Sequence, residues 1–386
     1  MNSNNQITTF IVMPCFNEED NLIESLSSLG FDSKAIQENM DVNLVVVDNN
    51  STDSTIAIAS RIKSQFPERI HLIKESEQGY VPARHAGNLY VRNFAEEKGW
   101  LIDDILILQV DADTFYSKGY ISAMKKASAF FGLNTMLEAY SEFPSSLKHK
   151  YANYIDLCNE IDYSLESIFV KSKTYDIIVD DKQCAYRLGD YFRWGTHIRE
   201  FLGNGDEIFA ETTRLFLKAR LSGATKVMLN NVYAEHSPRR ILEHPILQYV
   251  TAGFPREMAW KIKWLDKSIN IKEFLKLKDR DSIAWDDITN VRIIHLISLF
   301  NVLPIYINRI LGIKTTTCSN ILYDSISDSL PLYNKEILMV NPGHLILNVL
   351  NVVEQNFTSL KRLIYNEIGG EIGGETGDEN ISKRGG

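Results

Sequence analysis

Two carboxylates stand one residue apart at the end of an apolar segment. The residues ILILQV (105–110) lead directly into Asp111 and Asp113. Like charges this close repel each other, and a divalent cation with oxygen ligands relieves the repulsion. A structural interpretation is also open, in which Asp111 caps the following turn and Asp113 is a solvated loop acid. The spacing alone leaves the metal site and the structural acid pair as two alternatives.

Three more polar loops occur in the first ninety residues. PCFNEEDN (14–21) and DNNSTDST (48–55) each follow an apolar segment, and EQGYVPARHAGN (77–88) is a glycine-led loop that opens a helix. A helix N-terminus with an arginine nearby is suited to bind an anion. Acidic loops, an acid pair and an anion-binding loop at strand ends together predict a site for the metal-bound diphosphate of a nucleotide.

Because of the residues in these loops, the segment 9–120 resembles the family 2 glycosyltransferases, which have the GT-A fold. Four motifs of that family occur here in order and at the usual spacing. Any one of them is a weak signal, whereas four in order are strong. His85 stands where the third motif usually has Asn. The matching residues are Pro14, Phe16, Asn17 and Glu18; Val46, Val47, Asp48, Asn49, Ser51 and Asp53; Gly79, Ala83, Arg84 and Gly87; and Asp111 and Asp113.

The resemblance implies a role for each loop in binding the sugar donor. Asp48 would accept an N–H of the nucleotide base, with Asn50 beside it, and Arg84 would meet the phosphates. Asp111 would lie near the ribose or the metal, and Asp113 would bind Mn²⁺ or Mg²⁺ directly. The residues expected to line the base and ribose are Pro14, Phe16, Asn17 and Glu18.

Each of these residues also has a structural interpretation. Asn17 would cap a helix, Asp48 would form a turn, Asp53 would interact with a helix dipole, and Arg84 would be a surface helix residue. Taken singly, Asn17 and Asp53 favour the structural interpretation.

The segment GNGDEIFAETTRLFLKARLSG (203–223) resembles the acceptor side of the same family. The aspartate that usually serves there as general base is replaced by Thr212, and a hydroxyl group is a poor base at neutral pH. Glu211 is the first candidate for this role, followed by Asp206 and Glu207. The alternatives are that Glu211 only stabilises the helix N-terminus, or that the reaction uses no side-chain base and retains stereochemistry.

His236 follows the apolar end of a predicted strand. In many GT-A enzymes a histidine at this point is a third metal ligand, and imidazole combined with carboxylates suits Mn²⁺. A lone histidine is equally consistent with an ordinary surface residue. The next basic residues, Arg239 and Arg240, would bind phosphate or be solvated charges.

Strands and helices must alternate to position these loops. Because apolar segments alternate with segments of helical spacing over the first 130 residues, we expect an α/β fold with a mostly parallel sheet and flanking helices, followed by a helical C-terminal region. The segment 293–313 is apolar but carries polar side chains, which predicts a buried or interfacial helix pair broken near Pro304 and not a membrane span. Expected strands are 10–13, 42–47, 70–73, 105–110, 137–143 and 226–236, and expected helices are 18–29, 54–66, 81–97, 151–170 and 211–221.

Three regions are expected: a GT-A domain over 1–240, the helical region over 241–366, and a disordered tail over 367–386. The net charge of −9 argues against a nucleic-acid partner that needs a broad basic surface. The first residues lack the pattern of a signal peptide, and the four cysteines lack a CxxC pair. We therefore expect a cytoplasmic protein, with peripheral contact at the inner membrane surface or homo-oligomer formation as open roles for the C-terminal helices.

The sequence thus predicts a metal-assisted glycosyltransferase that uses a nucleotide-diphosphate sugar. Its acceptor is undetermined among a glycan, a lipid-linked molecule and a small molecule. Because Thr212 replaces the aspartate that usually serves as general base, the first alternative is a non-catalytic nucleotide-sugar-binding or scaffold protein. A sugar-phosphate nucleotidylyltransferase ranks lower, because its usual glycine-rich loop is replaced by PCFNEED.

Overall fold

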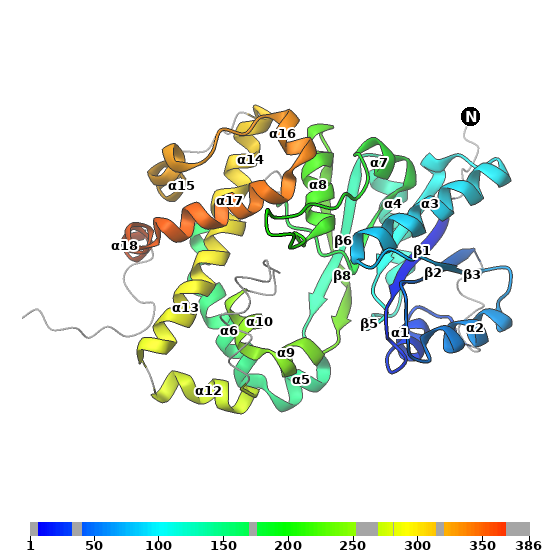
Figure 1. Ribbon diagram of the computed structural model, residues 1–386, viewed down its shortest axis with the longest axis horizontal. Helices are drawn as coiled ribbons and strands as arrows, with labels where there is room; N and C mark the ends of the chain where they lie inside the picture. The colour runs from blue at the N-terminus through cyan, green and yellow to red at the C-terminus, as the bar shows by residue number, and fades with distance from the viewer. Residues whose placement is uncertain are drawn as a thin grey trace, which may run out of the picture.

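An eight-stranded sheet organises the first two thirds of the computed structural model, which describes residues 7–32, 41–169, 176–251, 269–280, 282–313 and 320–367 (Figure 1). The strand order is β3-β2-β1-β4-β7-β6-β8-β5. Only β7 and β5 run against the common direction, so the sheet is mostly parallel as predicted. The strands are β1 (Thr8–Cys15), β2 (Val42–Asp48), β3 (Ile70–Lys74), β4 (Ile105–Val110), β5 (Thr114–Tyr116), β6 (Thr135–Glu142), β7 (Gln183–Arg187) and β8 (Thr225–His236).

Both faces of the sheet are covered by helices, which explains the almost unbroken apolar strands. In β1, Ile11 and Met13 belong to the core on one face, and Phe10 and Val12 belong to the core on the other. The first face is covered by α1 (Leu22–Ser28), α2 (Thr55–Gln65) and α4 (Tyr120–Phe131), and the second by α3 (Tyr80–Lys98), α7 (Leu188–Arg193) and α8 (Glu211–Leu221).

Helix α3 approaches the sheet closely at Gly87. A Cβ atom at this position would lie 2.4 Å from Val12 Cγ1 and 3.2 Å from Val47 Cγ2. The glycine of the third motif therefore serves the contact between helix and sheet. This contact fixes the N-terminus of α3, and with it Tyr80, relative to the ends of β1 and β2.

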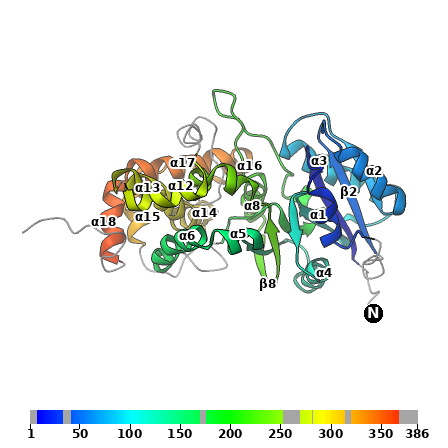
Figure 2. The same ribbon diagram turned by 90° about the horizontal axis from the view of Figure 1, so that it is seen from below.

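The rest of the chain is mainly helical and lies on the β6–β8 side of the sheet (Figures 1 and 2). This confirms the predicted architecture, an α/β sheet followed by a helical region. The helices outside the two sheet layers are α5 (Ser145–Lys150), α6 (Ala152–Ser164), α9 (Arg239–Glu243), α10 (Pro245–Val250), α12 (Ile271–Arg280), α13 (Ser282–Ile297), α14 (Leu303–Leu311), α15 (Ile321–Ile326), α16 (Lys335–Val340), α17 (Pro342–Gln355) and α18 (Phe357–Glu367), with short 3₁₀ turns at Ile102–Asp104, Glu166–Ile168 and Ser327–Ser329.

The core under these helices crosses the predicted boundary at residue 240. One apolar cluster joins Leu217 of α8 to Leu350 of α17. Another joins Tyr154 of α6 to Tyr249 of α10. The helical region therefore shares its buried surface with elements of the first region.

The apolar segment around Pro304 is one continuous helical path, not a broken pair. A π-helical turn (Ser298–Val302) connects α13 to α14, and Pro304 stands in the first turn of α14. Pro304 has no N–H to donate, and a proline inside a helical path removes one i→i−4 hydrogen bond, so the π-helical turn lies where the regular pattern is interrupted. The path Trp285–Leu311 is long and apolar enough to cross a membrane, but 78% of its most apolar window is buried inside the protein. A core helix passes the same test.

The predicted elements occur with small shifts at their ends. The strands β5 and β7 have no counterpart among the predicted strands. The expected tail over 367–386 lies outside the described residues except for Glu367.

Candidate functional site

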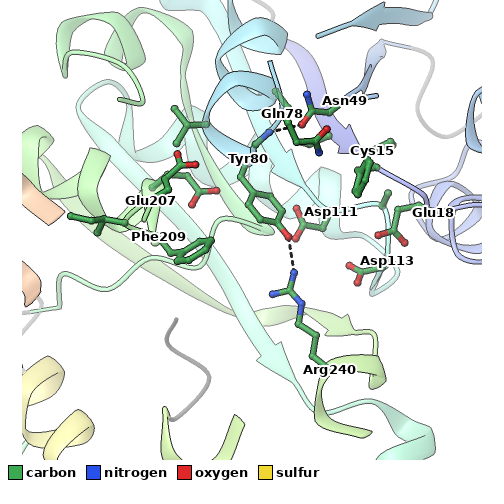
Figure 3. A pocket seen from close by; sticks show the side chains of 18 of the residues that line it. Cys15, Glu18, Asn49, Gln78, Tyr80, Asp111, Asp113, Glu207, Phe209 and Arg240 are labelled. Carbon is green, nitrogen blue, oxygen red and sulfur yellow. Dashed lines mark hydrogen bonds between the residues drawn. The ribbon is translucent and has the colours of Figure 1, made fainter. Parts of the chain in front are cut away.

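A cavity of about 400 Å³ opens where β1 and β4 end, beside the N-termini of α3 and α8 (Figure 3). Acids from the loops after β1 and β4 form one wall, and the loop before α8 forms the opposite wall. Its lining consists of Pro14, Cys15, Phe16, Glu18, Asn49, Gln78, Gly79, Tyr80, Val81, Ala83, Asp111, Ala112, Asp113, Glu207, Ile208, Phe209, Glu211, Arg214, Arg239 and Arg240.

Glu18, Asp111 and Asp113 form the acidic wall of the cavity. Burial raises the pKa of Asp113, and the charge of Glu18 raises it further. Burial also raises the pKa of Asp111, an effect that Arg84 partly offsets and that Asp181 and Asp113 increase. Asp111 and Asp113 therefore resist ionising together, and the acidic wall favours a cationic occupant.

The first two loops are tied to each other by their motif residues. Asn17 has φ 55° and accepts the Thr52 N–H through its side chain at 2.8 Å. Asp53 accepts the N–H groups of Glu19 and Thr55 at 3.2 and 3.0 Å. Asp48 is buried and accepts the Ser51 N–H at 3.0 Å, which closes a turn.

The second loop is tied to the third in a similar way. Asn50 donates to the Ser76 carbonyl at 2.9 Å, and Asn49 accepts the Gly79 N–H at 2.8 Å. Among the described residues predicted to bind the donor, Asn17, Asp48, Asn50 and Arg84 lie outside the cavity lining, whereas Pro14, Phe16, Glu18 and Asp111 belong to it. Most polar side chains of the first two motifs, in loops 14–21 and 48–55, thus hold the loops in place.

Arg84 lies beneath the cavity and is fully buried. Its three nitrogens reach the side chains of different elements, so the arginine is already committed to acceptors of the protein. The contacts are Nε to Glu211 at 3.2 Å, Nη1 to Gln109 at 3.1 Å, and Nη2 to Asp111 at 2.7 Å and to Asp181 at 3.2 Å. In the structure, Arg84 pairs with buried carboxylates. This position differs both from the phosphate contact implied by the resemblance and from a surface position.

The three candidate bases have different surroundings. Glu211 lines the cavity at the first position of α8, where Ala210 with φ 62° turns the chain into the helix. Glu207 also lines the cavity, but both of its oxygens accept from Arg199, at 3.0 and 2.6 Å. Asp206 lies outside the lining and accepts from the Asn204 side chain. Thr212 is buried, 3.3 Å from the ring of His197, so its hydroxyl is not part of the cavity wall.

Asp181 lies next to the cavity lining and is a residue that sequence reasoning missed, as are Tyr80 and Phe209 within the lining. It shares a side-chain hydrogen bond with Glu211, and burial and the Asp181 charge raise the pKa of Glu211 to about 8. The pKa of Asp181 itself is lowered, because Arg84 outweighs the cost of burial. In the sequence, Asp181 is marked only by the neighbouring acid Asp180 in the segment DDK (180–182), which matches none of the four motifs.

Two arginines of α9 close the mouth of the cavity. Arg239 Nη2 lies 3.2 Å from Glu18 Oε1 and 3.4 Å from Asp113 Oδ2. Arg240 donates to the hydroxyl of Tyr80 at 2.8 Å, and Figure 3 shows this pair spanning the opening beside Phe209. The site therefore combines the acidic wall with two arginines that can approach an anion.

His236 ends β8 and is paired in register with Thr114, next to Asp113. Its Nε2 lies 2.6 Å from Ser141 Oγ, and its Nδ1 is buried without a hydrogen-bond partner. Burial holds the pKa of His236 well below its usual range, so the ring is neutral. In the described ranges, no three His, Cys, Asp or Glu side chains are grouped as a metal centre.

Residues 10–130 match glycosyl transferase family 2. This match confirms the resemblance to family 2 glycosyltransferases. The family 2 segment contains the acidic wall of the cavity and the other lining residues from Pro14 to Asp113, whereas Glu207, Glu211, Arg239 and Arg240 lie beyond it.

Known relatives match only part of this chain. An uncharacterised glycosyltransferase of Mycobacterium tuberculosis is 37% identical over 79 residues, and so is one of Mycobacterium bovis. These residues are 20% of this chain and 29% of each relative, so the chain spans less than a third of the relatives it matches.

Two solved structures resemble the chain over most of its length, at low identity. TarS of S. aureus (residues 1–349) has a TM-score of 0.41 and 14% identity, and the match covers 91% of both chains. The mannosyltransferase PcManGT from Pyrobaculum calidifontis, in complex with GDP-Man and Mn²⁺, has a TM-score of 0.45 and 14% identity, with 91% of this chain and 87% of that chain covered.

Proposed function

We propose that this protein transfers a sugar from a nucleotide-diphosphate sugar to an acceptor, with the help of Mn²⁺ or Mg²⁺. The observation that carries the proposal is the cavity itself, in which the acids of the family 2 segment face Arg239 and Arg240. A diphosphate needs both features, since the arginines attract its oxygens and the acids hold a cation against it.

The residues present fit a hard divalent cation. Asp111 and Asp113 supply carboxylate oxygens on one loop, and burial together with the Glu18 charge raises the pKa of Asp113, so a cation beside this carboxylate would be stabilising. The unpartnered Nδ1 of His236, adjacent to this loop, is a further donor suited to Mn²⁺. Because Mg²⁺ commonly binds one or two carboxylates plus substrate phosphates, a full set of protein ligands is not required.

A bound cation would stabilise the charge that develops on the departing diphosphate. The chain's own residues perform the remaining tasks. Arg239 and Arg240 would bind the diphosphate oxygens at the mouth, and Tyr80 and Phe209 would restrict water and offer aromatic surface to the sugar. Glu211 would accept the proton of the acceptor in its ionised form, with Arg84 holding its carboxylate toward the cavity.

Donor binding tests this proposal directly. The full chain is titrated with UDP- and GDP-sugars, with and without Mn²⁺, and its thermal stability is measured. A ligand that binds only the folded state raises stability by about 2.7 kcal/mol at a hundred times its Kd. We expect stabilisation that needs both the nucleotide sugar and the metal, followed by metal-dependent release of the nucleoside diphosphate. A sugar donor that binds but is never consumed, with any acceptor or water, would favour the non-catalytic alternative.

A further inference from the structure

Arg239 is held between two acids that come from different loops. Its Nη2 lies 3.2 Å from Glu18 Oε1, after β1, and 3.4 Å from Asp113 Oδ2, after β4. The Glu18 carboxylate is oriented for this contact, because Asn21 donates to its other oxygen at 3.0 Å. A single positive group therefore bridges the two acids of the cavity wall.

The position of Arg239 is that of a counter-ion. The side chains of Glu18 and Asp113 are only 13% and 19% exposed, so water screens them poorly. A single guanidinium nitrogen reaches both carboxylates, at 3.2 and 3.4 Å, so Glu18 and Asp113 lie close enough for their like charges to repel each other. The guanidinium relieves this repulsion, which is the task that a divalent cation would perform at the same carboxylates.

Arg239 is also easy to remove from this position. Its side chain is 42% exposed, and it belongs to a five-residue helix at the surface. A side chain with this exposure can turn toward water and stay hydrated, so Arg239 loses less on leaving the two acids than a buried arginine would. Arg84, by contrast, is fully buried, so separating it from its carboxylate partners would leave an uncompensated buried charge at a high cost in free energy.

We propose that Arg239 occupies the cation position of the Glu18–Asp113 pair while the site is empty, and gives it up when the metal-bound diphosphate enters. This inference rests on the proposed function. A guanidinium and a divalent cation cannot both neutralise the same two carboxylates, because their own repulsion opposes it. Once displaced, Arg239 is next to the incoming phosphates and binds them, so the same side chain disfavours the metal alone and favours the metal with its nucleotide.

Metal binding without nucleotide is the decisive measurement. Mn²⁺ affinity of the full chain is determined by electron paramagnetic resonance for the wild type, Arg239→Gln and Arg92→Gln. Arg92 is the matched control, since it is an arginine of similar exposure that pairs with Glu96 on the surface of α3 and does not line the cavity. We expect Arg239→Gln to bind Mn²⁺ more tightly by about five- to tenfold, where tenfold is ~1.4 kcal/mol, and Arg92→Gln to stay within about twofold of wild type.

The second arm adds UDP or GDP at fixed Mn²⁺. Arg239→Gln is expected to bind the nucleoside diphosphate more weakly than wild type, although it binds the metal more tightly. The double variant Arg239→Gln/Asp113→Asn should lose the gain in Mn²⁺ affinity, which locates that gain at the acid pair. Equal or weaker Mn²⁺ binding by Arg239→Gln would overturn the proposed exchange, in which the metal replaces Arg239 at the Glu18–Asp113 pair.

Failure of the exchange and failure of the proposed function give different results. If wild type consumes a nucleotide sugar equally well in EDTA and Arg239→Gln does not, Arg239 replaces the metal permanently; the exchange is then wrong and glycosyl transfer stands. If no nucleotide sugar binds under any condition, the proposed function is wrong, and with it the exchange.

Discussion

Each acid that lines the cavity has an arginine beside it. Arg239 contacts Glu18 and Asp113, Arg84 contacts Asp111 and Glu211, and Arg199 contacts Glu207. The arginines differ in exposure, because Arg84 is fully buried and Arg239 is substantially exposed. At the scale of the residue, the buried pairs shape the site, and the exposed Arg239 pair is the one that a ligand can reach and rearrange.

Asp113→Asn tests the metal at this scale. The substitution removes one ligand charge while keeping the size of the side chain, so the fold should persist. We expect transfer to be lost and EDTA to have the same effect on wild type, reversed by added Mn²⁺. Turnover and the thermal unfolding curve are measured together. Full activity of the wild type in EDTA would exclude a metal-dependent reaction.

Glu211→Gln tests the general base. Since the pKa of Glu211 is raised to about 8, the carboxyl is mostly protonated below that pH and accepts a proton only as pH rises through it. Wild-type turnover should therefore increase with pH up to about 8, and the variant should lose this step together with about 10²–10⁴-fold of turnover. Donor affinity should be nearly unchanged.

Asp206→Asn is the matched control for Glu211→Gln, because Asp206 comes from the same segment but lies outside the cavity lining. It should retain near-normal turnover. If Glu211→Gln does the same, neither Glu211 nor Asp206 is the base, and the remaining explanations are Glu207 as the base or a base-free reaction with retained stereochemistry.

At the scale of the element, the loops are positioned by close contacts between helix and sheet. Gly87 is such a contact, since a Cβ would approach Val12 Cγ1 to 2.4 Å. Gly87→Ala should lower the free energy of unfolding by about 1–3 kcal/mol, the usual cost of overpacking a core. Gly203→Ala is the control, because a Cβ there has no neighbour within 4 Å. Chemical denaturation measures both, and equal stability of the two variants would contradict the packing role.

The sequence predicts strands and helices well where their apolar pattern is strong. β4 and α8 begin and end where the pattern indicates. β7 was not predicted because only three residues, CAY, separate the polar Gln183 from Arg187, although all five residues of the strand are buried. Asn17 and Arg84 show a different limit. The motifs correctly locate these side chains near the site, but only the tertiary contacts reveal that they bind loop backbone and buried acids instead of facing the cavity.

At the scale of the whole molecule, a buried carboxylate connects the C-terminal helices to the site. Glu200 accepts from Arg214 Nη1 at 2.9 Å, and Arg214 both belongs to α8 and lines the cavity. The same carboxylate accepts the N–H of Gly343 at 2.9 and 3.0 Å and that of His344 at 3.3 Å, at the start of α17. The N-terminus of α17 is thus fixed to the cavity wall by one acid.

Glu200→Gln tests whether the two regions fold as one unit. The change leaves the Arg214 guanidinium without its buried counter-charge, which typically costs about 3–5 kcal/mol. Because Glu200 joins α8 to α17, and the apolar core is continuous between them, we expect the destabilisation to appear in both regions at once. Hydrogen exchange of peptides from α3 and α17 should show the same loss of protection, within one cooperative transition. Glu336→Gln, on the exposed side of α16, is the control and should leave exchange unchanged. If α17 alone loses protection in Glu200→Gln while α3 keeps it, the helical region is an independent unit, and residue 240 is then a true domain boundary.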